Sequence, residues 1–128
     1  VDDRVLFTGP VPREELAKVY LALDVYAMLS AFDTFGMVVL EAMAAGLPVA
    51  ISGTVGARDV VVQGENGFVI EEPQRPAEVA AILSILLNPR ERERMGEIAR
   101  RTAREHTWER AAARVEGHYR RLLFPDRE

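Results

Sequence analysis

The chain has 128 residues, of which 48% are hydrophobic and 28% are charged, as in ordinary globular proteins. This length predicts one domain over residues 1–128. The sequence contains no cysteine, which excludes a disulfide scaffold, thiolate-bound metals and a cysteine nucleophile. Sixteen basic against twenty acidic residues give a net charge of −4, which argues against a general nucleic-acid-binding protein.

The chain shows no targeting signal. It opens Val1-Asp2-Asp3-Arg4, without the basic and then apolar pattern of a signal peptide. No apolar run approaches the roughly 18 to 20 residues that cross a bilayer. We therefore expect a cytoplasmic protein, and the missing initiator Met suggests a piece of a longer chain.

Short apolar runs bounded by turn residues predict four strands. They are Val5–Thr8, Val25–Leu29, Val49–Ser52 and Phe68–Ile70. Because these runs are apolar at successive positions, both faces of each strand are expected to be buried, as in a parallel sheet.

Apolar residues at helical spacing predict helices between and after the strands. The segments are Pro12–Leu23, Phe35–Ala45, Ala57–Val62 and three helices after Pro76, separated by Asn88-Pro89 and by Thr107 as an N-cap. Gly46 is expected in the left-handed conformation that ends the second helix. The alternation predicts an α/β fold: a three-layer, Rossmann-like parallel sheet of about four strands with flanking helices.

The loop from Ser30 into the helix expected at Phe35 is the candidate site. In open α/β sheets, ligands bind outside the carboxyl ends of the strands. The first N–H groups of the helix would point there, and Gly36 would let a phosphate approach the backbone closely. Glu41 is the one carboxylate on this apolar helix and needs a hydrogen-bonding partner. A ribose is suitable, since two vicinal hydroxyls can donate to two carboxylate oxygens.

The pattern Ser-x-x-acid-x-Phe-Gly-x-x-x-x-Glu-Ala-Met-x-x-Gly-x-Pro-Val, from Ser30 to Val49, resembles the signature of glycosyltransferase family 4. Further segments are similar to that family and follow in its order. They are Val5–Gly9, Glu14–Val25, Val55–Asp59, Gly64–Gly67 and Thr107–Glu109. The resemblance implies a retaining GT-B enzyme, which moves a sugar from a nucleoside diphosphate sugar to an acceptor hydroxyl.

The resemblance also implies roles for single residues. Glu41 would hold the donor ribose. Asp33, where the family usually has Glu, would be the catalytic-site carboxylate near the donor sugar. Backbone amides that would contact sugar or diphosphate are those of Phe35, Gly36, Met37 and Val38. Thr8 and Gly9 belong to a strand-to-glycine segment that would lie near the donor base. No metal site and no cofactor are implied, the nucleotide sugar being the substrate.

The family's acceptor-binding N-terminal domain precedes these segments, together with the basic residues that neutralise the diphosphate. We therefore expect residues 1–128 to be a truncated donor-binding domain that is inactive by itself. In the Rossmann strand order 3-2-1-4-5-6 the predicted strands resemble 3, 4, 5 and 6. Val5–Thr8 would thus lack its neighbour, and we expect it either to re-dock against Val25–Leu29 or to cause dimerisation through that edge.

Other interpretations are available for the same residues. Glu41 could face solvent, Gly36 could serve packing alone, and Asp33 and Thr34 could simply cap the helix. Residues 88–128 hold eleven Arg against eight acidic residues, net +3, which allows peripheral contact with anionic lipid at the inner face of a membrane.

Two other classes of protein fit the same α/β pattern. A receiver-like signalling domain is one alternative, although the single lysine, Lys18, falls on the first helix rather than at a strand end. A non-catalytic interaction module is the other.

Overall fold

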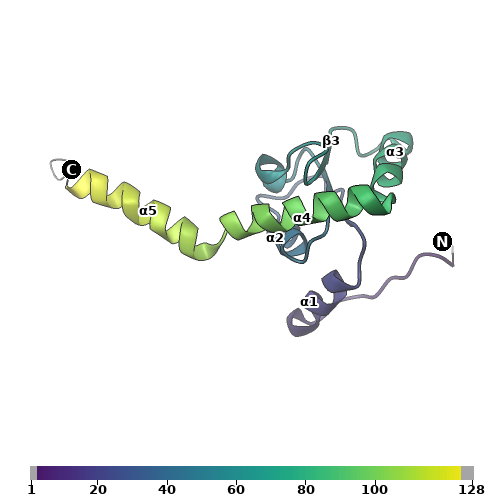
Figure 1. Cartoon of the computed structure of the whole chain (residues 1–128), viewed down its shortest axis with the longest axis horizontal. Helices are drawn as coiled ribbons and strands as arrows, with labels where there is room; N and C mark the ends of the chain where they lie inside the picture. Colours follow the sequence, from purple (N-terminus) through teal and green to yellow (C-terminus); the bar gives the residue numbers. More distant parts are fainter. Residues whose placement is uncertain (1–2, 125–128) are drawn as a thin grey trace.

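The computed structural model (Figure 1) describes residues 3–124. Within them it contains one parallel sheet in the order β1-β2-β3. The strands are β1 (Tyr26–Met28), β2 (Val49–Ser52) and β3 (Gly67–Ile70). The helices are α1 (Arg13–Leu21), α2 (Met37–Ala44), the 3₁₀ helix η1 (Gly56–Val60), α3 (Pro76–Leu86), α4 (Pro89–Glu105) and α5 (Trp108–Leu123). The parallel α/β architecture with flanking helices confirms the predicted fold class.

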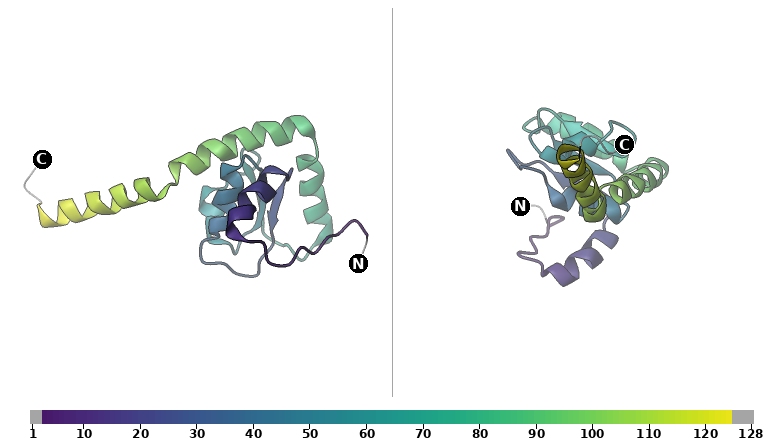
Figure 2. Two further views of the ribbon diagram at one scale, coloured as in Figure 1. Left: turned by 90° about the horizontal axis from the view of Figure 1, so that it is seen from below. Right: turned by 90° about the vertical axis from the view of Figure 1, so that its left-hand side faces the viewer.

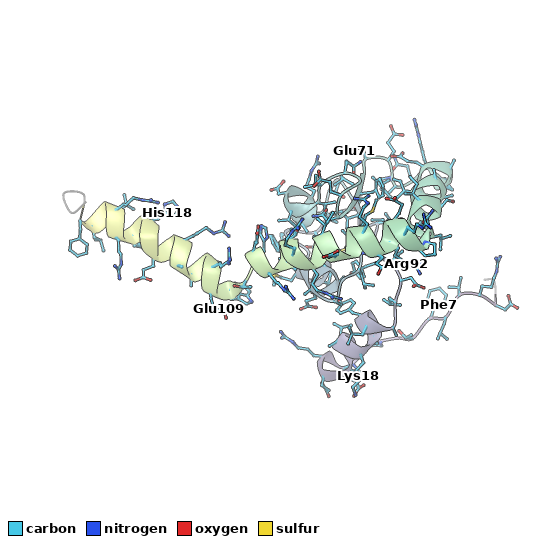
Figure 3. All side chains as sticks on the ribbon, in the orientation of Figure 1. Phe7, Lys18, Glu71, Arg92, Glu109 and His118 are labelled. Carbon is cyan, nitrogen blue, oxygen red and sulfur yellow. The ribbon has the colours of Figure 1, made fainter. Side chains whose placement is uncertain are left out.

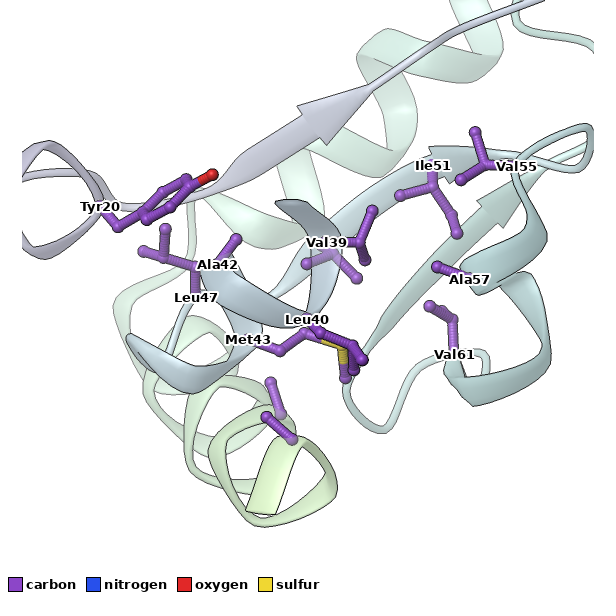
Figure 4. Packing of buried hydrophobic residues seen from close by; sticks show 13 residues of the cluster. Tyr20, Val39, Leu40, Ala42, Met43, Leu47, Ile51, Val55, Ala57 and Val61 are labelled. Atoms are coloured by element: carbon purple, nitrogen blue, oxygen red, sulfur yellow. The ribbon is translucent and has the colours of Figure 1, made fainter. Parts of the chain in front are cut away.

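The central strand β2 is buried on both faces, as expected for a parallel sheet. Val49 and Ile51 belong to a cluster with residues of α2, η1 and the second half of α4 (Figure 4). Ala50, which alternates with them, packs with Ile70, Leu86 and Met95 on the other face. Helices therefore cover the sheet on both sides, and the apolar strand pattern reflects this burial.

Helix α4 crosses the amino ends of all three strands (Figure 2, left). Each loop that leads into a strand contacts it. The contacts are Asp24 with Arg92 (3.2 Å), the Ala45 carbonyl with Arg100 (3.0 Å) and Asn66 with Thr102 (3.2 Å). Because α4 covers the amino ends, the loops at the carboxyl ends of the strands remain as the place for a ligand.

Asn66, just before β3, is buried and satisfies three polar groups. Its Oδ1 accepts from the Val62 N–H (2.8 Å), and its Nδ2 donates to the Val60 carbonyl (3.0 Å) and to Thr102.

We expect Asn66→Ala to lower the free energy of unfolding by about 2 kcal/mol, because two backbone groups lose their partners. Urea denaturation measures this. Ser84→Ala removes an exposed hydroxyl and should change stability by less than about 0.5 kcal/mol; equal losses in the two variants would contradict the prediction.

Val5–Thr8 is not a strand, so the sheet described here has three strands rather than about four. Leu6 and Phe7 are 84% and 80% exposed, and Phe7 lies on an arm that runs away from the sheet (Figure 3). The expected re-docking onto β1 is wrong. A strand forms only where a partner supplies hydrogen bonds, and the three residues of β1 supply too few to repay the ordering of the arm. Dimerisation through this edge stays a prediction.

Several predicted helix ends shift. Helix α2 begins at Met37 rather than Phe35, because Gly36 before it has the left-handed φ of 81°. Helix α1 ends at Leu21, not Leu23, and the segment after Gly56 is a 3₁₀ helix. Gly46, with φ 88°, ends α2 as predicted, and Thr107 caps α5 by accepting a hydrogen bond from the Arg110 N–H.

Helix α5 extends away from the body of the molecule (Figures 1 and 2). None of its residues, all of which are described, is buried, and Trp108 is 75% exposed. Val115, Tyr119 and Leu122, which follow one another at helical spacing, are exposed as far as the structure describes the chain.

Candidate functional site

The loops after β1 and β2 are bonded to each other at the carboxyl ends of the strands. The Ser30 carbonyl accepts hydrogen bonds from the hydroxyls of Ser52 (2.5 Å) and Thr54 (2.8 Å). The Asp33 N–H donates to the Thr54 carbonyl (3.3 Å), and the Gly56 N–H donates to the Asp33 carbonyl (3.0 Å). This bonding holds the start of α2 against the neighbouring loop.

Asp33 shapes the turn that leads into α2. Its Oδ1 accepts a hydrogen bond from the Phe35 N–H at 3.0 Å, as in an Asx turn. The N-cap of α2 is Gly36, without a side-chain hydrogen bond, so neither Asp33 nor Thr34 caps the helix. The capping interpretation is wrong, and the Phe35 amide is occupied by Asp33.

The N-terminus of α2 offers backbone donors. Within residues 3–124, the N–H groups of Gly36, Met37 and Val38 find no protein acceptor, and the first turn of α2 carries no acidic side chain. By contrast, the Asn88 side chain accepts from the first N–H groups of α4. Free N–H groups and the positive end of the helix dipole together favour an anion at this end of α2.

Gly36 is required by the packing of this turn. It has a positive φ, and a Cβ added to it would lie 2.8 Å from Cγ1 of Val55. Gly36 therefore serves packing in this turn, and that it serves packing alone stays a prediction. Close approach of a phosphate to the same backbone stays a prediction.

Glu41, one turn further along α2, faces α1. It is half-buried and lines a groove of about 390 Å³. The other lining residues are Arg13, Leu16, Ala17, Tyr20 and Leu21 of α1 and Ala44 and Ala45 at the end of α2. The Tyr20 hydroxyl donates to Glu41 Oε2 across a long 3.4 Å. Glu41 therefore faces a neighbouring helix and a groove rather than open solvent.

The charges of the two candidate carboxylates, Asp33 and Glu41, both affect the pKa of Tyr26 in β1. Burial raises the pKa of Tyr26 first, and the charges of Glu41 and Asp33 raise it further. The pKa of Tyr20 is raised to about 12, chiefly by burial, then by Tyr26 and Glu41. Both phenols are therefore neutral near pH 7.

The structure does not bring Thr8 and Gly9 to this site. Both are exposed on the arm before α1, and the Thr8 hydroxyl donates to the Gly9 carbonyl at 3.1 Å. Their predicted contact with the donor base stays a prediction.

A second groove, of about 430 Å³, lies between α2 and the start of α5. It is lined by Phe35, Met37 and Leu40 and by His106, Thr107, Trp108, Ala111 and Arg114. The described residues include no group of three or more His, Asp or Glu placed to hold a metal ion. No helix within residues 3–124 has both the length and the apolar character needed to span a bilayer.

A sequence model of the family Glycosyl transferases group 1 matches residues 1–102, more than half of the chain. The chain belongs to this glycosyltransferase family. It is 36% identical over 118 residues to a D-inositol 3-phosphate glycosyltransferase of Corynebacterium urealyticum, covering 92% of this chain and 28% of the relative. It is 35% identical over 114 residues to a sulfoquinovosyl transferase of Arabidopsis thaliana, covering 86% of this chain and 22% of the relative.

A solved structure has the same fold as this glycosyltransferase chain. The sucrose-phosphate synthase of Thermosynechococcus elongatus superposes with a TM-score of 0.82 and 33% identity, over 94% of this chain and 31% of that protein. The chain thus spans less than a third of the length of these relatives. Membership of this family excludes the receiver-like alternative.

Sequence reasoning missed the contacts of two side chains at or beside the site of this glycosyltransferase chain. Helical spacing places Tyr20 on an apolar helix face, whereas its hydroxyl contacts Glu41. A phenol within an apolar stripe is a usable signal, since buried tyrosines usually find a hydrogen-bond partner. Arg58, whose guanidinium donates to the Gly53 carbonyl (2.7 Å) and pairs with Glu71 (3.3 Å), joins the loops after β2 and β3 and has no sequence signal.

Proposed function

We propose that this chain is the donor-binding part of a retaining glycosyltransferase, which transfers a sugar from a nucleoside diphosphate sugar to an acceptor hydroxyl. The observation that carries the proposal is the N-terminus of α2. Its N–H groups at Gly36, Met37 and Val38 have no acceptor among the described residues and lie at the carboxyl ends of the strands. A diphosphate satisfies these donors and the helix dipole together.

The second contact is made by Glu41. It lies four positions after Met37, a rise of about 6 Å along the helix, comparable with the span from a diphosphate to its ribose. With the diphosphate at the helix end, the ribose hydroxyls lie over the groove that Glu41 lines. Asp33, in the turn before the helix, then lies on the sugar side of the diphosphate.

This chain contributes electrostatic stabilisation to the proposed reaction of the parent enzyme. When the sugar leaves the diphosphate, negative charge grows on the phosphate oxygen, and the preorganised N–H groups of α2 stabilise that charge. We propose that no divalent metal or other cofactor takes part. The retaining outcome follows from the resemblance to family 4 enzymes.

The remaining components belong to the parent enzyme. We propose that the acceptor site and the basic residues facing the diphosphate lie in the part of the relatives that this chain does not span. In the Corynebacterium enzyme, of which 28% is covered, that part is the remaining 72%. The 128-residue chain therefore binds nucleotide weakly and is inactive alone. A cytoplasmic location, with peripheral contact to anionic lipid, stays a prediction.

Titration of the ¹⁵N-labelled chain with uridine, guanosine and adenosine diphosphates tests the proposal by NMR. We expect the amide signals of Gly36, Met37 and Val38 to shift with at least one of them. The amides of Gly64 and Glu65, in the turn before β3 at the α4 end of the sheet, are the internal control and should not move. Absence of binding by all three nucleotides, or shifts centred on the control amides, would favour the non-catalytic interaction module.

A further inference from the structure

Tyr20 links α1 to the rest of the molecule. It is the one buried residue of α1, all of which is described, and is 6% exposed. Its ring lies edge-on to Tyr26, with 5.9 Å between the ring centres and 75° between the planes. It belongs to the same cluster as Ala42 and Leu47 (Figure 4). The ring is thus fixed by packing on β1 and α2.

The Tyr20 hydroxyl has a task that packing does not require. A phenylalanine would fill the same space, but only the phenol donates to Glu41 Oε2. The pKa of about 12 keeps this hydroxyl protonated throughout the physiological range, so it always acts as the donor and the carboxylate as the acceptor.

We propose that Tyr20 is a positioning residue, which orients the Glu41 carboxylate for binding the two ribose hydroxyls of the donor. This inference rests on the proposed function of Glu41. A carboxylate has two oxygens and about four acceptor sites. With one site of Oε2 held by Tyr20, rotation of the carboxylate is restricted, and Oε1 with the rest of Oε2 accepts from a vicinal diol. Tyr20 touches no part of the nucleotide itself.

The test is Tyr20→Phe in the 128-residue chain, with calorimetric titration of whichever of the three diphosphates binds tightest and of its 2′,3′-dideoxy analogue. We expect the affinity for the ribonucleotide to fall about threefold to tenfold, the net size of a typical hydrogen bond in water, because Tyr20 acts only through its long bond to Glu41. The affinity for the dideoxy analogue should not change, since it has no diol for Glu41 to bind. Tyr119→Phe, the same change at an exposed position on α5, is the matched control and should alter neither affinity.

A double variant separates positioning from structure. If Tyr20 acts through Glu41, adding Tyr20→Phe to Glu41→Ala should cause no further loss. Equal weakening of both nucleotides by Tyr20→Phe would indicate a general effect of α1 and would overturn the proposal. The proposal would also be overturned if the unaltered chain binds the ribonucleotide more tightly than its dideoxy analogue and Tyr20→Phe leaves the affinity for the ribonucleotide unchanged. If the unaltered chain binds both nucleotides equally or neither, the proposed role of Glu41 fails, and the positioning role fails with it.

Discussion

Replacing Gly96 by alanine is expected to lower the free energy of unfolding by about 3 kcal/mol. Gly96 lies where α4 crosses the turn between α2 and β2, and a Cβ there would overlap the backbone carbonyl of Gly46. The nearest atoms on the other side of the contact are the backbone O and C of Gly46, so no flexible side chain can move aside and α4 must shift as a unit. Overpacking of this kind costs about 1–3 kcal/mol, and the shift also weakens the contacts of α4 with the loops before the strands.

Gly117→Ala is the matched control for this change. Gly117 is also inside a helix, α5, but apart from the adjacent backbone of α5 no described atom lies within 4 Å of the place of its Cβ. Alanine there should leave stability unchanged or raise it by up to about 1 kcal/mol, because glycine is the poorer helix former. Urea denaturation followed by circular dichroism compares the two variants. A Gly96 variant as stable as the Gly117 variant would show that α4 does not seat closely on this turn.

Glu41→Ala is expected to lower the affinity for the nucleoside diphosphate that the chain binds by about tenfold to 150-fold. This corresponds to about 1.5–3 kcal/mol for hydrogen bonds to a charged group. Global stability should change little, because the side chain is half-buried and its bond to Tyr20 is long. Calorimetric titration gives the affinity, and urea denaturation gives the stability.

Glu97→Ala separates the role of Glu41 from a general loss of negative charge. Glu97 is exposed on α4, on the side of the molecule that covers the amino ends of the strands. Its removal changes the net charge by the same amount and should leave the affinity unaltered. Equal affinities of the Glu41 variant and the unaltered chain would rule out Glu41 as the ribose-binding group.

Features that depend on neighbours along the chain follow from the amino-acid sequence. The apolar runs around Ala27, Ala50 and Val69 predict the three strands of the sheet, since a buried parallel strand needs apolar side chains on both faces. Gly46 and Thr107 mark helix boundaries because a positive φ and a side-chain cap are local requirements. The spacing of the two candidate carboxylates is likewise a property of the chain itself.

Features that depend on partners distant in sequence are set by the tertiary fold. Val5–Thr8 has the composition of a strand, yet it stays unpaired because a strand exists only where another strand accepts its hydrogen bonds. The contact of Tyr20 with Glu41 joins residues 21 positions apart, and the seating of Gly96 on Gly46 joins residues of different elements. Helical periodicity predicts which face of α5 is apolar, but whether that face is buried depends on the surface that it meets. In this chain the described residues bury none of it, although its first turn borders a groove shared with α2.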